Sequence, residues 1–290
     1  MVIIKMRIIT RRKGNKDYYY LQHSYRENNK IITKEIYLGK NIPKNLAEIK
    51  EKLEKEIRKE VYFKLEKIKE NFQKEWKKLP ETVKDKEKEN IAIAFTYNTN
   101  AIEGSTITLQ ETKLILQDKM APNKPLNEIK ETENHAKVFF EMLSKKENVN
   151  IALLLKLHKD IFNETKKDIV GKFRDYLVRV GDYIAVDWQD VNKLMQELIT
   201  FINKSNLNAV ELAAISHYRF EKIHPFGDGN GRIGRLLMNY ILWKNNYPML
   251  VIENKKKFSY YRALQKGEEA FLKYFLRIYL KVHKKYINYV

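Results

Sequence analysis

The feature that most constrains this chain is a glycine-rich bend between two apolar stretches of helical period. Residues 208–223, NAVELAAISHYRFEKI, and residues 232–245, RIGRLLMNYILWKN, repeat apolar side chains at helical spacing. The bend between them, HPFGDGNGR at 224–232, holds three of the ten glycines of the chain. Two apolar helices joined in this way predict a loop that leads directly into a helix amino terminus.

A loop of this kind is suited to binding anions. Successive backbone N–H groups point out of it, and the helix that follows adds the positive end of its dipole. Gly229 and Gly231 permit backbone angles and a close approach that a Cβ would prevent. Arg232 and Arg235 are three residues apart, so they share one face of the first helical turn and can both bind phosphate oxygens.

The residue types beside this anion site favour phosphoryl or nucleotidyl transfer. Asp228 can hold Mg²⁺, which needs few protein ligands when it bridges phosphates. His224 can accept the proton of an attacking hydroxyl, because the pKa of histidine lies near neutrality. A Walker loop is excluded because the Gly-Lys-Ser/Thr sequence is missing. A calcium loop is excluded because Phe226 and Leu237 stand where its acidic end ligands belong.

The amino-terminal segment differs from the rest of the chain. Residues 1–40 contain three runs rich in β-branched and aromatic residues, separated by the turn formers RKGNK and RENNK. We expect a small antiparallel β-sheet over 1–42. Ten Lys and Arg against three Asp and Glu make residues 1–40 basic, within a net charge of +19 for the chain. Nucleic acid could bind residues 1–40, because tyrosines can stack on bases, but we favour a lid that buries its aromatic residues on the neighbouring domain.

Beyond residue 42 the pattern is mainly helical, so we expect a mainly α fold. A long charged helix over 43–84, with a break at Pro80, links the sheet to a helical domain over 85–290. Residues 173–187, FRDYLVRVGDYIAVD, alternate around Gly181-Asp182 and predict a β-hairpin. Within the helical domain, helices are predicted at roughly 86–102, 109–118, 126–145, 150–163, 188–204, 207–222, 232–245 and 258–288.

Composition excludes several classes of site. The chain has no cysteine, so disulfides, thiolate zinc sites and cysteine nucleophiles are ruled out. The amino terminus does not resemble a signal peptide, and no apolar run reaches the length of a membrane span. We therefore expect a cytoplasmic protein without a membrane partner. His217 is predicted to be a packed core histidine, whereas Glu131, Glu133 and Asp160 are expected on solvated helix faces.

The bend resembles the signature of the Fic family, H-x-F-x-[D/E]-G-N-G-R-x-x-R, and it matches every fixed position from His224 to Arg235. The resemblance extends over roughly residues 85–285. GKFRDYLVRVGDYIAV resembles the flap hairpin of the family, and FSYYRAL resembles a later segment that contains tyrosines. The resemblance implies a Fic-type helical domain that transfers AMP from ATP to a hydroxyl of a target protein.

The same resemblance implies a role for each matching residue. His224 is the base, Phe226 anchors the loop in the core, and Asp228 binds Mg²⁺. The γ-phosphate of ATP is reached by Arg235. The α- and β-phosphates are held by Gly229, Asn230, Gly231 and Arg232.

Two further segments are assigned by resemblance to the nucleotide and the target. The hairpin residues that would clamp the target backbone and border the nucleotide are Val180, Gly181 and Tyr183. Tyr260 and Tyr261 would lie near the adenine. An asparagine that follows these tyrosines in the family has no counterpart in QKGEEAF, which leaves base specificity open.

TNAIEG at 99–104 resembles the inhibitory motif [S/T]-x-x-x-E-[G/N], which some Fic proteins carry on a helix before the core domain. Here that helix would span 86–104. Glu103, near a helix end closed by Gly104, is expected to pair with Arg235. Arg235 could then no longer hold the γ-phosphate, and ATP would bind in a pose unsuited to in-line attack.

Three functional hypotheses follow. The leading one is a protein adenylyltransferase that uses Mg·ATP, is restrained by Glu103 and modifies a Ser, Thr or Tyr hydroxyl of a target protein or of itself. The second is the reverse reaction, removal of AMP from a modified protein. The third belongs to a different class, a basic nucleic-acid-binding regulator whose nucleotide site is only a sensor. The sequence leaves the oligomeric state open, a homodimer included.

Overall fold

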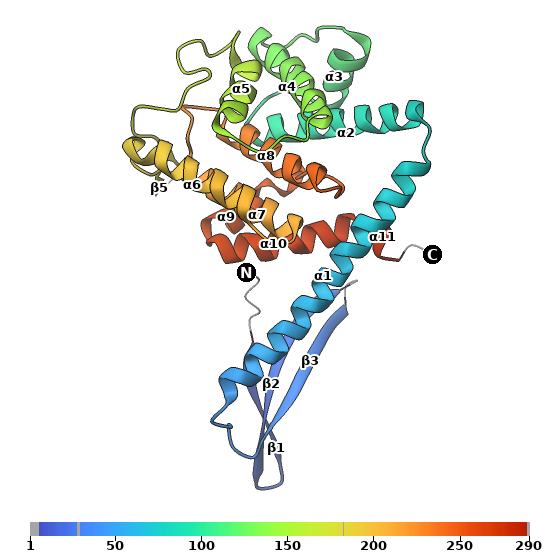
Figure 1. The fold of residues 1–290 in the computed structure, drawn as a ribbon, viewed down its shortest axis with the longest axis vertical. Helices are drawn as coiled ribbons and strands as arrows, with labels where there is room; N and C mark the ends of the chain where they lie inside the picture. Colours follow the sequence, from blue (N-terminus) through green and yellow to red (C-terminus); the bar gives the residue numbers. More distant parts are fainter. Residues whose placement is uncertain (1–5, 28–29, 182, 289–290) are drawn as a thin grey trace. The chain divides into compact units, whose positions relative to one another are not determined.

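The structure is a computed structural model that describes residues 6–27, 30–181 and 183–288 (Figure 1). The chain divides into two compact units, Met1–Glu66 and Lys67–Val290, and the division falls inside the long helix α1, Leu46–Lys78. Residues 1–5 and 28–29 of the predicted sheet lie outside the described residues. So does Asp182, the second residue of the predicted hairpin turn.

The first unit contains the small antiparallel sheet that the sequence predicts. Its strands β1 (Arg7–Lys13), β2 (Lys16–Glu27) and β3 (Lys30–Gly39) pair in the order β1-β2-β3. Ile8 lies opposite Leu21, and Leu21 lies opposite Ile36, so the three side chains share one face. Leu21 is fully buried, and on the same face Lys34 forms an ion pair with Glu60 of α1. The first part of α1 therefore covers this face of the sheet (Figure 1).

The second unit is helical. Its elements, after the end of α1, are α2 (Glu81–Ile102), α3 (Leu109–Lys113), the π-helical turn η1 (Leu114–Asp118), α4 (Leu126–Ser144), α5 (Ile151–Phe162), the hairpin strands β4 (Arg179–Val180) and β5 (Tyr183–Ile184), the 3₁₀ turn η2 (Trp188–Asp190), α6 (Val191–Lys204), α7 (Ala209–Ile223), α8 (Asn230–Lys244), the 3₁₀ turn η3 (Asn254–Lys256), α9 (Lys257–Gln265), α10 (Glu268–Val282) and α11 (Lys284–Ile287). The mainly α fold with a hairpin and an amino-terminal sheet is confirmed.

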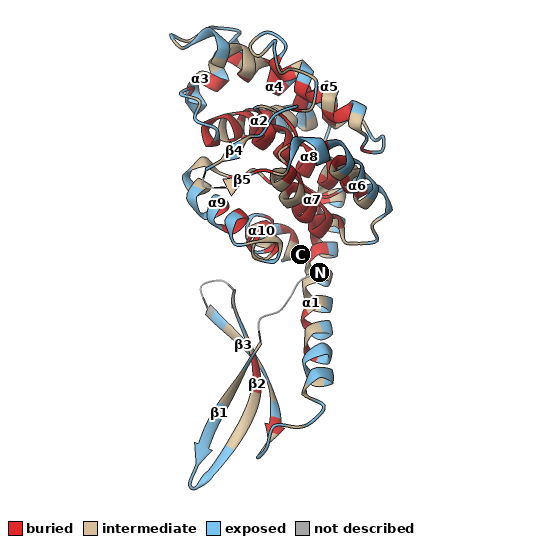
Figure 2. Cartoon of the chain, turned by 90° about the vertical axis from the view of Figure 1, so that its left-hand side faces the viewer, coloured by how far each residue is buried: buried red, intermediate tan, exposed pale blue. Residues whose placement is uncertain are grey.

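Helices α7 and α8 form the centre of this unit, and almost every residue of α8 is buried (Figure 2). Helix α8 contacts α2, α4, α5 and α7. Local signals fix where the helices begin: Asn208 caps α7 by accepting a hydrogen bond from the Val210 N–H, and Thr108 and Glu111 form a capping box at α3. This central position explains why α8 is buried on all sides from Asn230 to Leu242.

Several boundaries differ from the sequence-based predictions. Helix α2 begins at Glu81, directly after Pro80 and five residues earlier than predicted, and ends at Ile102, so Glu103 caps it. The single helix predicted over 258–288 is wrong, because Gly267, with φ 104°, separates α9 from α10, and His283 ends α10. Helix α8 begins at Asn230, two residues earlier than predicted, because Gly229 already completes the bend with φ 79°. Among the described residues, no helix has the length and apolar content needed to cross a bilayer.

Candidate active site

The bend between α7 and α8 is fixed by its backbone angles and by one amide. It opens with His224, at φ 52°, and closes with Gly229 at φ 79°. The Asn230 side chain accepts a hydrogen bond from the Phe226 N–H through Oδ1 and donates one to the Phe226 carbonyl through Nδ2, both at 2.8 Å. This amide is thus engaged by the loop itself, so Asn230 could offer only its backbone N–H to an anion.

Phe226 seats the loop in the core. It is fully buried and stacks on His158 of α5, with ring centroids 4.0 Å apart. The Gly171 N–H donates to Nδ1 of His158, so Nε2 carries the proton and donates to the Asp228 carbonyl at 3.1 Å. Burial lowers the pKa of His158 to about 4, which keeps the ring neutral in this position. No local pattern predicts this support, because His158 lies 70 positions before Asp228.

His224 has the properties of a general base. Its Nδ1 lies 3.4 Å from the Glu221 carbonyl oxygen, which favours a proton on Nδ1 and leaves Nε2 as the acceptor. Burial lowers the pKa of His224, although the Glu221 carbonyl opposes this effect. The imidazole is therefore neutral at pH 7 and can accept a proton.

Arg174, which the sequence analysis did not single out, ties the bend to the hairpin segment. It is 4% exposed and donates to the carbonyls of His224 at 2.8 Å, Tyr176 at 2.7 Å and Val186 at 2.6 Å. Its own N–H donates to the Pro225 carbonyl. A buried guanidinium that satisfies this many carbonyls fixes the backbone on both sides of His224.

The predicted ion pair between Glu103 and Arg235 is present. Nη2 of Arg235 lies 2.6 Å from Oε1 of Glu103, at the carboxyl end of α2. Arg235 is 1% exposed, and its Nε donates to Oγ1 of Thr99 at 2.6 Å. Burial acts against the charge of Arg235, but the Glu103 carboxylate more than compensates and raises the pKa of the guanidinium. Thr99 and Glu103 are the first and fifth residues of the TNAIEG motif, so the motif holds Arg235 from both ends.

The Glu103 carboxylate also reaches the first turn of α8. A Cβ built on Gly231 would overlap Oε1 of Glu103 and would stand 2.9 Å from Nη1 of Arg235. An anionic group thus already lies against the amino terminus of α8, where the backbone N–H groups have no intrahelical partner. This is the place where the sequence predicted a phosphate.

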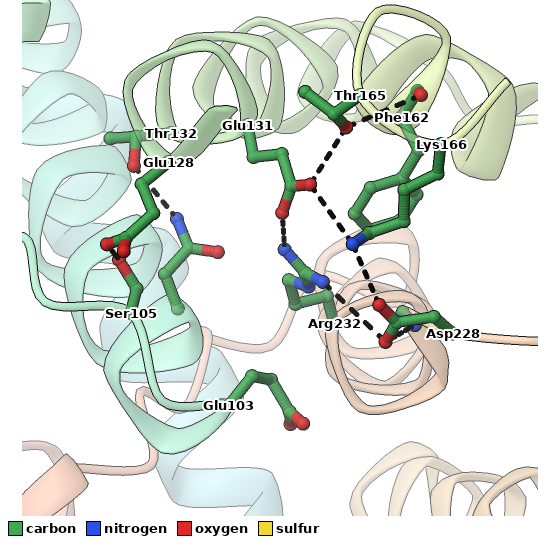
Figure 3. Close-up of polar contacts among 12 residues, drawn as sticks. Glu103, Ser105, Glu128, Glu131, Thr132, Phe162, Thr165, Lys166, Asp228 and Arg232 are labelled. Carbon is green, nitrogen blue, oxygen red and sulfur yellow. Dashed lines mark hydrogen bonds and ion pairs between the residues drawn. The ribbon is translucent and has the colours of Figure 1, made fainter. Parts of the chain in front are cut away.

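A second charged cluster surrounds Asp228 (Figure 3). Nζ of Lys166 lies 2.9 Å from Oδ2 of Asp228 and 3.4 Å from Oε1 of Glu131. Glu131 forms an ion pair with Nη1 of Arg232, whose guanidinium lies 4.4 Å above the ring of Phe162. The expectation of a solvated helix face was therefore wrong for Glu131, which is 12% exposed because it lies between two cations.

Asp228 is the carboxylate best placed to hold a metal ion. Burial opposes its charge, but the hydrogen bond from Lys166 and the guanidinium of Arg232 lower the pKa of Asp228. Its side chain is 51% exposed and thus accessible. Within the described ranges, no three His, Asp or Glu side chains gather into a metal-binding group. One carboxylate together with substrate phosphates fits Mg²⁺, which keeps most of its ligands outside the protein.

The hairpin lies against the end of α7. Val180 pairs with Tyr183, and Gly181 turns the chain with φ 58°. The Tyr183 hydroxyl lies 3.2 Å from the carbonyls of Glu221 and Lys222, to which it can donate. These contacts hold the hairpin beside His224.

The two tyrosines of α9 occupy different positions. Tyr261 is 37% exposed, and its hydroxyl donates to the Ile102 carbonyl. Tyr260 has no exposed surface and bonds Nε2 of His217 at 2.7 Å, so it cannot touch a nucleotide from this position. The sequence-based position near adenine needs this correction for Tyr260, whereas the prediction of a packed His217 is confirmed.

Comparisons with known proteins agree with this geometry. A sequence profile described as Fic/DOC family matches residues 148–242. A protein named "Protein adenylyltransferase Fic" from Nematostella vectensis is 32% identical over 200 residues, which cover 66% of this chain and 47% of that protein. The protein of the same name from Drosophila ananassae is 35% identical over 188 residues, 62% of this chain and 38% of its own length. The chain thus spans less than half the length of these relatives.

Solved structures show the same fold. A Fic domain containing signaling protein from Bacteroides thetaiotaomicron superposes with a TM-score of 0.67 at 26% identity, covering 79% of this chain and 94% of that one. Fic-1 from C. elegans superposes with a TM-score of 0.69 at 24% identity, covering 83% and 74%. The second likeness concerns the fold alone.

Proposed function

The chain belongs to the Fic family, and from this premise we propose that it is a protein adenylyltransferase, which transfers AMP from ATP to a hydroxyl of a target protein. The observation that carries the proposal is the convergence at the α8 amino terminus. A neutral His224, the Asp228 carboxylate and the guanidinium of Arg235 surround backbone N–H groups that already attract a carboxylate. Such a site suits a triphosphate and a nucleophile that loses a proton.

In the proposed reaction, the hydroxyl oxygen of the target attacks the α-phosphorus of ATP. Nε2 of His224 accepts the hydroxyl proton, the bond to the α-phosphorus forms, and pyrophosphate leaves with the electrons of the broken P–O bond. The N–H groups of Gly229, Asn230 and Gly231 would stabilise the phosphate oxygens, where charge develops. The hairpin beside His224 would hold the target backbone by adding a strand.

Asp228 would hold Mg²⁺, which neutralises phosphate charge when it is bound. In the free protein the ammonium of Lys166 already lies at this carboxylate. Arg232 would contact the phosphates only after it exchanges part of its pairing with Glu131. Both changes replace one ionic contact by another, so neither exposes an unpaired buried charge.

Glu103 would inhibit the enzyme. Its carboxylate holds Arg235 and lies against Gly231, where it would compete with the γ-phosphate. The segment after it is held in place, because the Ser105 hydroxyl donates to Glu128 of α4 at 2.7 Å (Figure 3). Relief of inhibition therefore requires a rotation of the Glu103 side chain or a shift of the end of α2.

The test is adenylylation by the full chain in Mg²⁺, with a protein lysate as a source of targets. ATP labelled at the α-phosphate should label protein strongly with Glu103→Gly, weakly with the unchanged chain, and not at all with Glu103→Gly/His224→Ala. ATP labelled at the γ-phosphate should leave no label on protein. Intact-mass measurement identifies any adenylyl group on the chain itself. If the single variant transfers nothing from any nucleoside triphosphate, the proposed activity is wrong.

The reverse reaction is a second candidate, because the Glu103 carboxylate is 30% exposed and could orient a water molecule beside the phosphate site. With an adenylylated protein as substrate, Glu103→Ala should then lose AMP release while it gains AMP transfer. We also propose that the chain acts in the cytoplasm.

A further inference from the structure

The face of the amino-terminal sheet that points away from α1 takes no part in the proposed chemistry. Residues paired across antiparallel strands lie on the same face. Arg7 lies opposite Gln22, which lies opposite Glu35, and Ile9 lies opposite Tyr20, which lies opposite Tyr37. These rows alternate with the row of Leu21, which is buried on the α1 side.

This outer face is polar and already organised by hydrogen bonds. Nε of Arg7 donates to Gln22 at 2.7 Å, the Gln22 amide donates to Glu35 at 2.7 Å, and the Ser24 and Thr33 hydroxyls lie 3.0 Å apart. Beside them lie the rings of Tyr18, Tyr20 and Tyr37, with centroids 5.2 to 6.3 Å apart. Gln22 is 8% exposed and positions its two neighbours, whereas the exposed Arg7, Ser24 and Thr33 can bond a base edge or a phosphate.

One end of the sheet is strongly basic. The hairpin between β1 and β2 turns at Gly14, which has φ 60° and empty space around its Cβ position. Arg12, Lys13 and Lys16 flank this turn and are exposed, and we refer to these three residues as the basic tip. Asp17 is the acidic side chain near them, 3.8 Å from Arg12.

The positive charge of the first unit belongs to the sheet and not to the helix behind it. Residues 1–40 hold ten Lys and Arg against three Asp and Glu. In residues 46–66, the part of α1 in this unit, six Lys and Arg face six Asp and Glu. If the charge served only solubility, it would not need to be concentrated on the sheet while α1 stays balanced. Binding of a polyanion to the sheet explains this distribution of charge.

We propose that the outer face and the basic tip bind double-stranded DNA. The major groove admits a β-ribbon, and the exposed Arg7 and Arg11 of β1 can reach base edges there, with the basic tip against phosphates. Arg11 lies 4.6 Å over the ring of Tyr20, and Tyr37 covers it from the side. Tyr20 thus offers little surface to an unstacked base. Tyr37 is 52% exposed, but a single open ring does not form the row of stacking platforms that a single strand needs, so a duplex fits this face better.

The test measures fluorescence anisotropy of a labelled duplex of mixed sequence with the full chain, over a range of salt concentrations. Arg12→Gln/Lys13→Gln/Lys16→Gln removes three phosphate contacts. Each contact contributes a slope of about −0.9 in log affinity against log salt, so the slope should become shallower by up to about 2.7. Because these residues are exposed at a turn, the melting temperature of the variant should stay unchanged.

The matched control is Lys52→Gln/Lys55→Gln/Lys59→Gln, which removes the same charge from exposed positions on α1. It should leave the slope unchanged. Three results would overturn the proposal: no salt-dependent binding to the duplex, an equal loss in both triple variants, or tighter binding of the corresponding single strand. The adenylylation assay is unaffected by any of these outcomes, so the two proposals fail independently.

Discussion

Removal of the Glu103 carboxylate should strengthen ATP binding while it weakens the free protein. The contact of Glu103 with Arg235 is a charge-assisted hydrogen bond of 2.6 Å to a guanidinium that is 1% exposed. Such a bond contributes about 1.5–3 kcal/mol. Binding of the ATP phosphates to Arg235 must break this bond. Without it, in Glu103→Ala, the affinity for ATP should rise about 10- to 150-fold.

The same change leaves Arg235 buried without a carboxylate. Its bonds to Thr99 remain, so the loss of unfolding free energy should be about 2 kcal/mol. In a unit of this size that corresponds to a fall in melting temperature of about 4–8 °C. Saturating ATP should reverse the fall, because its phosphate charge takes the place of the lost carboxylate.

The measurement is calorimetric titration with Mg·ATP and thermal unfolding, both in a His224→Ala background so that no turnover occurs. Glu133→Ala in the same background is the control, because Glu133 pairs with Lys137 on the exposed side of α4. This control should change neither the ATP affinity nor the melting temperature. An ATP affinity within about twofold of the background in Glu103→Ala would refute the idea that this carboxylate competes with phosphate.

Three further outcomes are expected. Lys166→Met should lower the half-saturating Mg²⁺ concentration about threefold in the adenylylation assay of Glu103→Gly, because it frees the half-exposed Asp228 from an ammonium. Burial raises the pKa of Glu221 to about 8 from 4.5, so the folded chain holds a proton that the unfolded chain releases. The stability that this group contributes therefore falls as pH rises from about 4.5 to 8. In Glu221→Gln the melting temperature should depend less on pH over that range, as measured by thermal unfolding. Gly231→Ala should fold, since alanine suits a helix, but should abolish ATP binding in calorimetry because its Cβ fills the anion position.

The sequence by itself determined the bend and the motif that faces it. Glycines, a helix start and a histidine within nine residues are local signals, because backbone angles and dipole direction depend on neighbours in the chain. The pairing of Glu103 with Arg235 could also be predicted from the sequence, because each residue stands in a recognisable motif, TNAIEG at 99–104 and the signature at 224–235. The amino-terminal sheet could be predicted in the same way, because runs rich in β-branched residues alternate with turn formers there.

Only the tertiary structure decided what supports these groups. Glu131 lies 101 positions from Arg232, and Arg174 lies 50 positions from His224, so neither contact leaves a pattern in the chain. The sequence predicts that Glu131 is a surface glutamate and that Tyr260 lies near the nucleotide. In the fold Glu131 is only 12% exposed and Tyr260 is fully buried. Periodicity reports which face of a helix is apolar, but the identity of the partner across a buried ion pair depends on how helices pack, which is a property of the whole fold.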